Sequence, residues 1–391
     1  MILEQIVFAL ALFALGLSFM AFVKAFPKIR VILKLPGFLI KRFRRSTRPL
    51  AESVFAVLIG LLVGALLMAA FGHNPIRGYI SMLKGFGLYI EEGYFRATEF
   101  AEMLAFATPL MLTAITFAVG MKAGLFNIGA EGQVYVGAAA AALIAGHFAL
   151  PAGLHLFAAT AIAMLAGAFW ALLPALLKLW KGVHEVISTI MLNWIAFHLV
   201  TYLVIYHLAG VLAERTATAL PTARYAVLME GSTLTTVIFV AIAFCIGVYI
   251  LLWRTRIGYE LRLAGDNPDA ARYAGISLRR AMLVSFVIGG MAAGLAGASQ
   301  VIGRPPAWSL YATLGTVATL GFTGIGIALV GRNHPIGGIF AAIFFAGVVH
   351  GGRFMEYDWG ISSELVVAIQ GVFVIALAIP ALLSIIRRRP K

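Results

Sequence analysis

Long apolar runs recur along the whole chain and are separated by short polar or glycine-rich segments. Each run has about 18 residues or more, enough for a helix to cross roughly 30 Å of hydrocarbon. The pattern predicts eleven membrane-spanning helices, near residues 2–24, 51–71, 102–121, 128–149, 154–178, 185–209, 233–253, 281–303, 309–331, 335–352 and 362–385.

Composition supports this interpretation. Hydrophobic residues make up 62% of the chain and charged residues only 12%, far from the fractions found in soluble domains. The first run, 2–24, carries Glu4 and no basic residue ahead of its apolar core. A cleaved signal peptide has positive charge there, so we expect this helix to be retained. The expected fold class is an all-α polytopic membrane helix bundle without a sizeable soluble domain.

The position of the basic residues predicts the orientation of the chain in a cell membrane. The net charge is +14, and with the N-terminus outside, 23 of the 30 Lys and Arg side chains fall on the cytoplasmic side. An excess of Lys and Arg in cytoplasmic loops determines orientation. The C-terminus is then cytoplasmic as well. The basic segment 24–48 is expected to bind anionic membrane lipid, and no nucleic-acid partner is expected.

Two sets of four spans, residues 102–209 and 281–385, start on opposite sides of the membrane and would form inverted repeats. Each set contains a glycine-rich interruption, 124–132 in the first and 321–331 in the second. Many transporters build a midplane pathway from broken helices at matching places in two repeats. The alternative is that these glycines only allow helices to pack closely. That packing role is expected for two small-xxx-small pairs, Gly290 with Gly294 and Gly347 with Gly351.

No constellation of residues indicates catalysis, a metal or a cofactor, so we do not expect an enzyme. The chain has no Walker-type sequence for ATP, its histidines lack the spacing of a metal site, and no nucleophile recurs with a matching base. Carboxylates are scarce within the spans, since Glu131, Glu185 and Glu364 fall at span ends. An ion-coupled secondary transporter needs ionisable groups at depth and is the alternative from another class.

The cytoplasmic loop 254–280 predicts a short helix at its centre. Asp266 or Asn267 can cap its N-terminus, and Pro268 suits the first helical position. Gly275 can end the helix in a left-handed conformation, which leaves about two turns. Small side chains on this helix would form a knob that docks in a groove on another protein. The alternative is that the helix packs on its own membrane domain.

Three segments of the chain resemble a known family. They are GLFNIGAEGQ (residues 124–133), EVISTIMLNWIA (185–196) and GYELRLAGDNPDAARYAGIS (258–277), supported by GGMAAGLAGASQVIG (289–303). They are similar to the permease subunits of the ribose and branched-chain amino acid class of ABC importers, and within that class to the nucleoside branch. The resemblance covers about residues 100–380.

This resemblance implies a ten-helix core like that of vitamin B12-type importers, over residues 51–391. Residues 1–50, with the first span and the basic segment, are an addition to the family pattern. The resemblance also implies an ABC ATPase subunit that binds the ATP, a second homologous or identical permease, and an extracytoplasmic substrate-binding lipoprotein. The chain itself would need no cofactor.

The resemblance also implies roles for individual residues. Those that match the helix through which the ATPase acts, the coupling helix, are Gly265, Asn267, Pro268, Ala271, Ala274 and Gly275. Those expected along the substrate pathway are Asn127, Glu131, Gln133, Asn193 and Trp194. Phe322 joins them because its ring, like that of Trp194, suits stacking on a nucleobase. The alternative is that the polar groups satisfy one another or exposed backbone inside the bundle.

Together these features predict the transmembrane permease subunit of an ATP-driven nucleoside importer that works by alternating access. An ABC permease for a simple sugar or a branched-chain amino acid is the alternative within the same fold.

Overall fold

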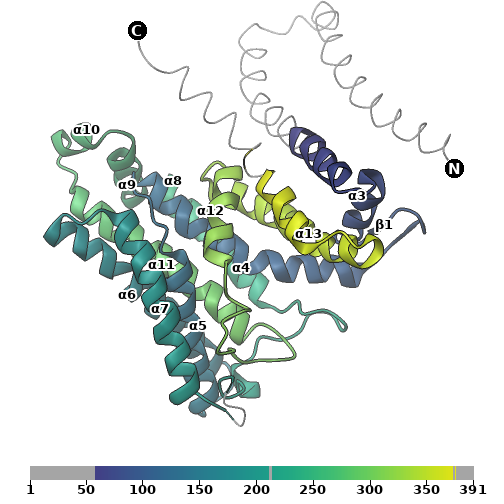
Figure 1. Ribbon diagram of the computed structural model, residues 1–391. Coiled ribbons are helices and arrows are strands. Elements are labelled where there is room, and N and C mark those ends of the chain that lie inside the picture. The colour runs from purple at the N-terminus through teal and green to yellow at the C-terminus, as the bar shows by residue number, and fades with distance from the viewer. Residues whose placement is uncertain (1–57, 211–213, 373–374, 376–391) are drawn as a thin grey trace, which may run out of the picture. The chain divides into compact units, whose positions relative to one another are not determined.

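The computed structural model describes residues 58–210, 214–372 and 375 (Figure 1). The first expected span, 2–24, the basic segment 24–48 and most of the second half of the last expected span lie outside these residues. The described part consists mainly of helices, with one short two-stranded ribbon.

The helices follow the order of the chain. They are α3 (Pro75–Lys84), α4 (Ala97–Lys122), α5 (Ala130–His147), α6 (Leu154–Lys181), α7 (Glu185–Tyr206), the 3-10 helix η1 (Pro221–Ala223), α8 (Val237–Arg254), α9 (Arg256–Asp266), α10 (Pro268–Tyr273), α11 (Leu278–Val301), α12 (Leu320–Val330) and α13 (Pro335–Trp359). Two further helices are Leu58–Ala70 and Ser363–Val372. Strands β1 (Leu88–Tyr89) and β2 (Tyr94–Phe95) pair antiparallel.

Six of the described helices, α4, α6, α7, α8, α11 and α13, are long and apolar enough to cross a membrane. Helix Leu58–Ala70 and α3 together would make a seventh span, bent by 119°. Helix α5 has 18 residues and occupies the expected span 128–149. The prediction of an all-α polytopic membrane protein is therefore confirmed.

The expected span 309–331 is wrong. Residues 302–319 form no regular helix, and α12, which follows them, has only 11 residues. The apolar side chains of Leu310, Leu314 and Val317 are completely buried within the protein instead of facing lipid. An apolar run can be buried by protein as well as by a bilayer, and its hydropathy is the same in both cases.

The backbone of this irregular segment pairs with the chain that precedes α8. The Thr216 N–H donates to the carbonyl of Leu310 at 2.9 Å, and the Ala219 N–H donates to that of Trp308 at 2.8 Å. Non-helical backbone inside a membrane protein is tolerated where the protein itself supplies such partners. The segment therefore needs no helix of its own.

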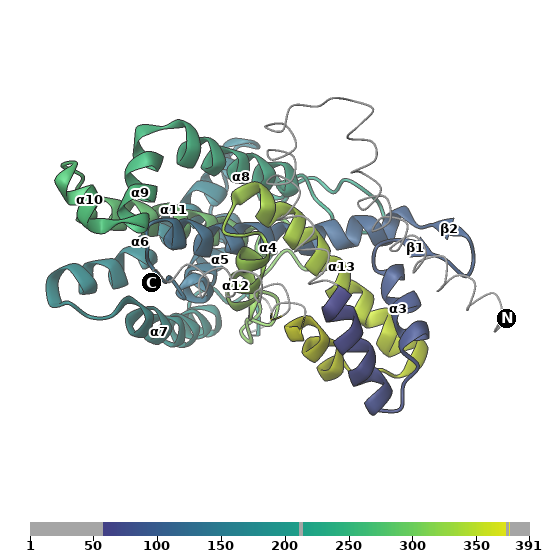
Figure 2. The same cartoon turned by 90° about the horizontal axis from the view of Figure 1, so that it is seen from above.

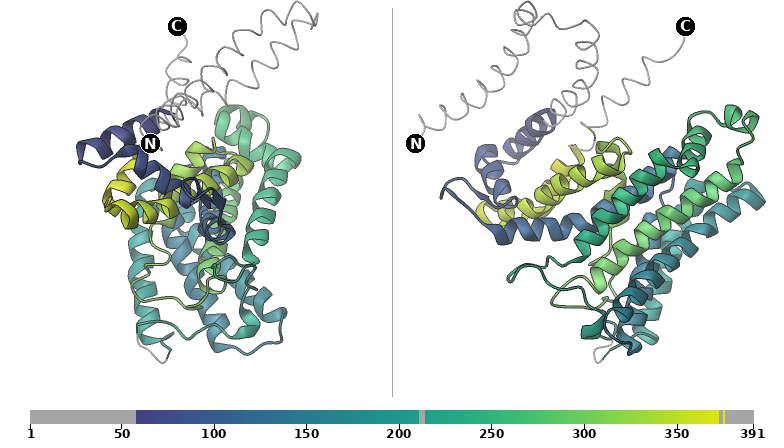
Figure 3. Two further views of the ribbon diagram at one scale, coloured as in Figure 1. Left: turned by 90° about the vertical axis from the view of Figure 1, so that its right-hand side faces the viewer. Right: turned by 180° about the vertical axis from the view of Figure 1, so that it is seen from behind.

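Helices α4 and α11 are the most buried of the spans. In the 18-residue apolar stretch of each helix, 83% of α4 and 78% of α11 are buried, whereas only 28% of α7 is buried. Helix α11 packs along α4, α5 and α6. Figure 2 shows α8 and α7 on opposite sides of this group. In Figure 3, the green pair α9 and α10 lies at the upper right of both views, at one end of α8 and α11.

Glycines bring these helices close together. A Cβ added at Gly290 or Gly294 of α11 would lie 2.5 or 2.2 Å from a backbone carbonyl oxygen of α6. A Cβ at Gly351 of α13 would lie 2.2 Å from a carbonyl oxygen of α3, and one at Gly347 would overlap the ring of Phe86. The packing role expected for both glycine pairs is confirmed.

Replacing Gly294 with Ala is expected to destabilise the protein by about 1–3 kcal/mol, because the added methyl group would overlap the α6 backbone. Thermal unfolding of the purified protein in detergent measures the loss. Gly247→Ala in α8 is the matched control, since an added Cβ there meets nothing within 4 Å. The control should unfold at or above the wild-type temperature, because Ala favours a helix more than Gly. Equal unfolding temperatures for the two variants would contradict the close packing of α11 on α6.

Candidate functional site

The loop between α8 and α11 contains the predicted short helix, α10. It begins at Pro268, and the side chain of Asn267 caps it by accepting a hydrogen bond from the Ala270 N–H at 3.0 Å. Gly275 follows the helix with a φ of +74°, a conformation that favours glycine. The predicted cap, first position and left-handed end are confirmed.

Helix α9, which precedes α10, was not predicted. Thr255 caps it by accepting a hydrogen bond from the Gly258 N–H at 3.2 Å, and Arg256 pairs with Glu260 one turn later at 2.9 Å. A threonine cap followed by an ion pair at i,i+4 is a helix signal present in the sequence.

The exposed surface of α10 is smaller than expected. Tyr273 is 95% exposed and Ala274 is also exposed, but Ala271 is completely buried. The expectation that Ala271 contributes to an exposed knob is therefore wrong, because its methyl group packs on the chain itself. One side of the helix packs on the chain, as the second alternative expects, and the other side is open, so docking on another protein stays a prediction.

Gly265, near the end of α9, meets the end of α4 backbone to backbone. A Cβ at Gly265 would lie 2.4 Å from the carbonyl oxygen of Lys122 and 2.6 Å from the nitrogen of Gly124. Gly124 itself has a φ of +73°, and its own added Cβ would lie 3.0 Å from the Cα of Gly265. Only glycine at both positions allows this approach.

The segment that follows, 124–129, links α4 to α5 and is held by buried amide side chains. Asn127 accepts a hydrogen bond from the Gly129 N–H at 2.9 Å, and Gln133 donates to Asn127 at 3.4 Å. Asn193 of α7 accepts from the Gly132 N–H at 2.9 Å. Asn193 also donates at 3.0 Å to the carbonyl of residue 128. These amides take the place of the hydrogen bonds that a continuous helix would provide.

Glu131 lies in the first turn of α5 and is only 3% exposed. Its carboxyl group accepts hydrogen bonds from the Tyr135 hydroxyl at 2.6 Å, from the Gly321 N–H at 2.7 Å and from the Thr319 N–H. The N–H groups at 319 and 321 belong to the start of α12. The side chain of the N-cap residue, Thr319, makes no capping hydrogen bond there. A carboxyl group at this position satisfies otherwise unpaired N–H groups and suits the positive end of the helix dipole. Glu131 therefore caps α12, which lies almost 200 residues further along the chain.

The residues expected along the substrate pathway divide into two groups. Asn127, Glu131, Gln133 and Asn193 come together as a buried set whose polar atoms mostly bond protein groups. Within the described residues, only the Asn127 Nδ2 and the Gln133 Oε1 of this set lack a partner. Trp194 and Phe322 are 61% and 49% exposed, although each directly follows a residue of the bonded network, Asn193 or Gly321. The buried set therefore fits the alternative, in which these polar groups bond one another and exposed backbone inside the bundle.

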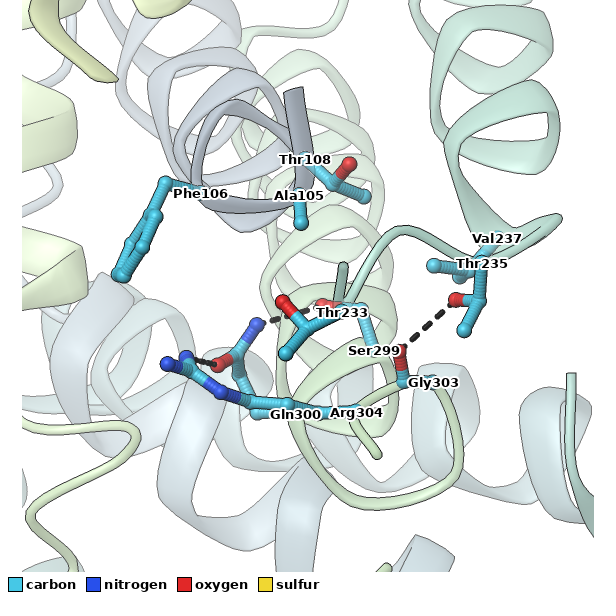
Figure 4. A pocket seen from close by; sticks show the side chains of 10 residues that line it. All are labelled: Ala105, Phe106, Thr108, Thr233, Thr235, Val237, Ser299, Gln300, Gly303 and Arg304. Atoms are coloured by element: carbon cyan, nitrogen blue, oxygen red, sulfur yellow. Dashed lines mark hydrogen bonds between the residues drawn. The ribbon is translucent and has the colours of Figure 1, made fainter. Parts of the chain in front are cut away.

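A second polar cluster, which sequence reasoning missed, lies between α4, α11 and the chain before α8 (Figure 4). Arg304 donates to Gln300 at 2.6 Å, and the guanidinium groups of Arg304 and Arg353 lie 5.1 and 4.7 Å from the centre of the Phe106 ring. The cavity beside them has a volume of about 10 Å³. That is room for about one water molecule and not for a solute.

A family model described as branched-chain amino acid transport system / permease component matches residues 100–378. The chain belongs to this permease family. A nucleoside ABC transporter permease of Lactococcus lactis subsp. cremoris is 33% identical over 88% of this chain and 95% of its own length. A guanosine ABC transporter permease of Bacillus subtilis is 33% identical over 87% and 95%. A glucose ABC transporter permease of Haloferax volcanii is 33% identical over 83% and 86%. No solved structure matches the chain.

In this permease the segment 124–133 contacts both of the other segments that carry the family resemblance. The segment 124–133 meets 258–277 where Gly124 lies against Gly265. It meets 185–196 where Asn193 bonds the backbone at residues 128 and 132. The motifs are far apart in sequence but form one continuous structural unit, which we call the motif cluster. This cluster, with Glu131 and the start of α12, is the candidate functional site.

Glu131→Gln is expected to destabilise the permease by about 1–3 kcal/mol. Both carboxyl oxygens accept from backbone N–H groups, so the amide NH₂ of glutamine would face a donor in either orientation. Thermal unfolding in detergent measures the change. Glu230→Gln, at an exposed loop residue, is the control and should match the wild type. An unchanged unfolding temperature for Glu131→Gln would show that the carboxyl group does not cap α12.

Proposed function

We propose that this chain is the membrane-spanning subunit of an ATP-driven importer of nucleosides. The observation that carries the proposal is the 33% identity to the nucleoside and guanosine permeases, each matched over 95% of its length. The glucose permease of similar identity favours a sugar importer as the second candidate.

An ABC ATPase subunit would supply the energy and bind the ATP, and α10 is the part of the described chain that we expect to meet it. The open side of α10 presents Tyr273, Ala274 and Gly275. Asn267 and Pro268 set where the helix begins, whereas Gly265 and Ala271 attach it to the rest of the chain. We therefore assign docking to the open side and anchoring to the buried side.

The remaining partners and the membrane arrangement follow the family pattern. A second permease, identical or homologous, and an extracytoplasmic substrate-binding lipoprotein would complete the importer. We propose a ten-helix core with inverted repeats at 102–209 and 281–385, in which the short α12 takes the place of the full span expected at 309–331. We also propose an added helix within 1–50, an outside N-terminus and a cytoplasmic C-terminus. The contact of Gly265 with the end of α4 agrees with the part of this arrangement that puts both on the same side of the membrane.

For the substrate pathway we propose a division of roles. Trp194 and Phe322 are exposed aromatic rings on which a nucleobase could stack as it crosses the membrane. The buried set, Asn127, Glu131, Gln133 and Asn193, holds the broken-helix region in shape instead of contacting the solute. During alternating access the two rings would then move together with the internally bonded cluster, because each neighbours a residue that it holds.

The substrate class is tested by uptake into proteoliposomes that contain the permease pair, the ATPase and the binding lipoprotein. We expect ATP-dependent uptake of radiolabelled guanosine, abolished by excess unlabelled adenosine and unaffected by excess glucose or leucine. Uptake of glucose and not of guanosine would support the sugar importer. Uptake driven by an ion gradient in vesicles without the ATPase would support a secondary transporter.

The docking role of α10 is tested by Ala274→Arg. A long charged side chain on the open face should obstruct a groove that fits small residues and lower ATP-dependent uptake about tenfold or more, equivalent to about 1.4 kcal/mol or more of docking free energy. Ala274 is exposed, so the unfolding temperature should stay at the wild-type value. Ala226→Arg, at an exposed residue of the loop before α8, is the control and should transport normally. Normal uptake by Ala274→Arg would exclude this face as the docking surface.

Ala271 cannot serve this test, because an arginine at a completely buried position would disrupt the fold.

A further inference from the structure

Two buried contacts, at Gly265 and at Glu131, join α10 to α12 through the segment 124–129. We propose that Gly265 and Glu131 are positioning residues of the transport cycle, which transmit the displacement of α10 by the motor subunit to α12. The inference rests on the proposed function, because it requires an ATPase that acts on α10. Figures 1 and 2 show α10 and α12 apart from each other, so a continuous series of contacts is needed to connect them.

The first step of the series is a rigid connection between α10 and the helices before it. Asn267 ends α9, where its N–H donates to the carbonyl of Leu263 at 3.0 Å, and its side chain caps α10. Ala271 is completely buried, which fixes one side of α10. Arg262 of α9 donates to the carbonyl of Leu252 in α8 at 3.0 Å. Helices α8, α9 and α10 should therefore move together.

The second step is the contact of Gly265 with the end of α4. The closest atoms are backbone atoms of Lys122 and Gly124, so no side chain lies between the two segments. A displacement of α9 cannot be absorbed by a rotamer change there, because packed backbones have no such freedom. The N–H of Leu125 also donates to the carbonyl of Gly120 at 2.9 Å, which fixes the start of the segment 124–129 to α4.

The third step passes from this segment to α5 and α7. Asn193 holds the carbonyl of residue 128 and the N–H of Gly132 with its two amide atoms, at 3.0 and 2.9 Å. Asn127 closes the turn before α5 through the Gly129 N–H. A shift of the segment 124–129 must therefore carry the first turn of α5, where Glu131 lies.

The last step is the capping of α12 by Glu131. Helix α12 is short, and residues with positive φ stand at both of its ends: Thr319 at +66° before it, and Arg332 and Asn333 at +56° and +52° after it. Short helices bounded by changes of backbone direction can turn as units. Its N-terminal N–H groups bond Glu131, so a movement of α5 would turn α12.

The test compares Gly265→Ala and Glu131→Gln with the control Gly247→Ala in the full importer, reconstituted in proteoliposomes. ATP hydrolysis and guanosine uptake are both measured per assembled complex. We expect each variant to hydrolyse ATP within about twofold of wild type while the guanosine imported per ATP falls about tenfold, a typical size for coupling between two sites. Gly247→Ala should match wild type in both quantities.

The double variant Gly265→Ala/Glu131→Gln discriminates further. Because both substitutions interrupt one series of contacts, its import per ATP should be no lower than that of the more affected single variant. If Gly265→Ala does not assemble, Asn193→Ala replaces it, since that change removes two hydrogen bonds of the same series without adding an atom.

Two results would overturn the inference. One is unchanged import per ATP in the single variants. The other is an equal fall in hydrolysis and uptake per assembled complex, which marks a merely structural role. If the proposed substrate class is wrong, the wild-type importer will not import guanosine and will import another solute such as glucose. The ratio of import to hydrolysis would in that case be measured with that solute, so the two failures are distinguishable.

Discussion

Backbone N–H and C=O groups that leave a helix inside a membrane protein must find partners within the protein, and this constraint shapes the described structure. The segment 124–129 meets it with its own Asn127, which bonds the Gly129 N–H and accepts from Gln133 of α5, and with Asn193 from α7. An amide offers a donor and an acceptor, and Asn193 uses both, for the carbonyl of residue 128 and the N–H of Gly132. The bonds of Asn193 thereby hold α7 against the segment and the first turn of α5.

The second irregular segment, 302–319, meets the same constraint by a different chemistry. It uses backbone partners from the loop before α8, such as the bonds that Thr216 and Ala219 donate. Both irregular segments lead into the N-terminus of a helix, α5 after the first and α12 after the second, and Glu131 connects those two helices. One carboxyl group thus joins the two places where the chain departs from continuous helix.

The sequence predicted the elements whose signals are local. Apolar runs placed α4, α6 and α11 within about five residues, because a long apolar helix has a distinctive length and composition. The capping residue Asn267 and the end signal at Gly275 located α10. Hydropathy could not distinguish Leu310, buried by protein, from a residue facing lipid. The small size of Ala271 suits an exposed knob and tight packing equally well. The partners of Glu131 could not be predicted, since they lie 188 and 190 residues away.

The energy source of the proposed importer can be argued from how its carboxyl groups are used. Glu131 has both oxygens engaged by backbone N–H groups, Glu185 pairs with Lys178 at 2.7 Å, and Glu99 lies 2.9 Å from a ring nitrogen of His350. A group that couples transport to an ion gradient has to exchange its partner during each cycle. Releasing Glu131 would leave two N–H groups of α12 unpaired, which is costly in a buried site. A motor that pushes on α10 from outside can move the cluster with these bonds intact, and the glycine contact at Gly265 provides the rigid connection that such a motor requires.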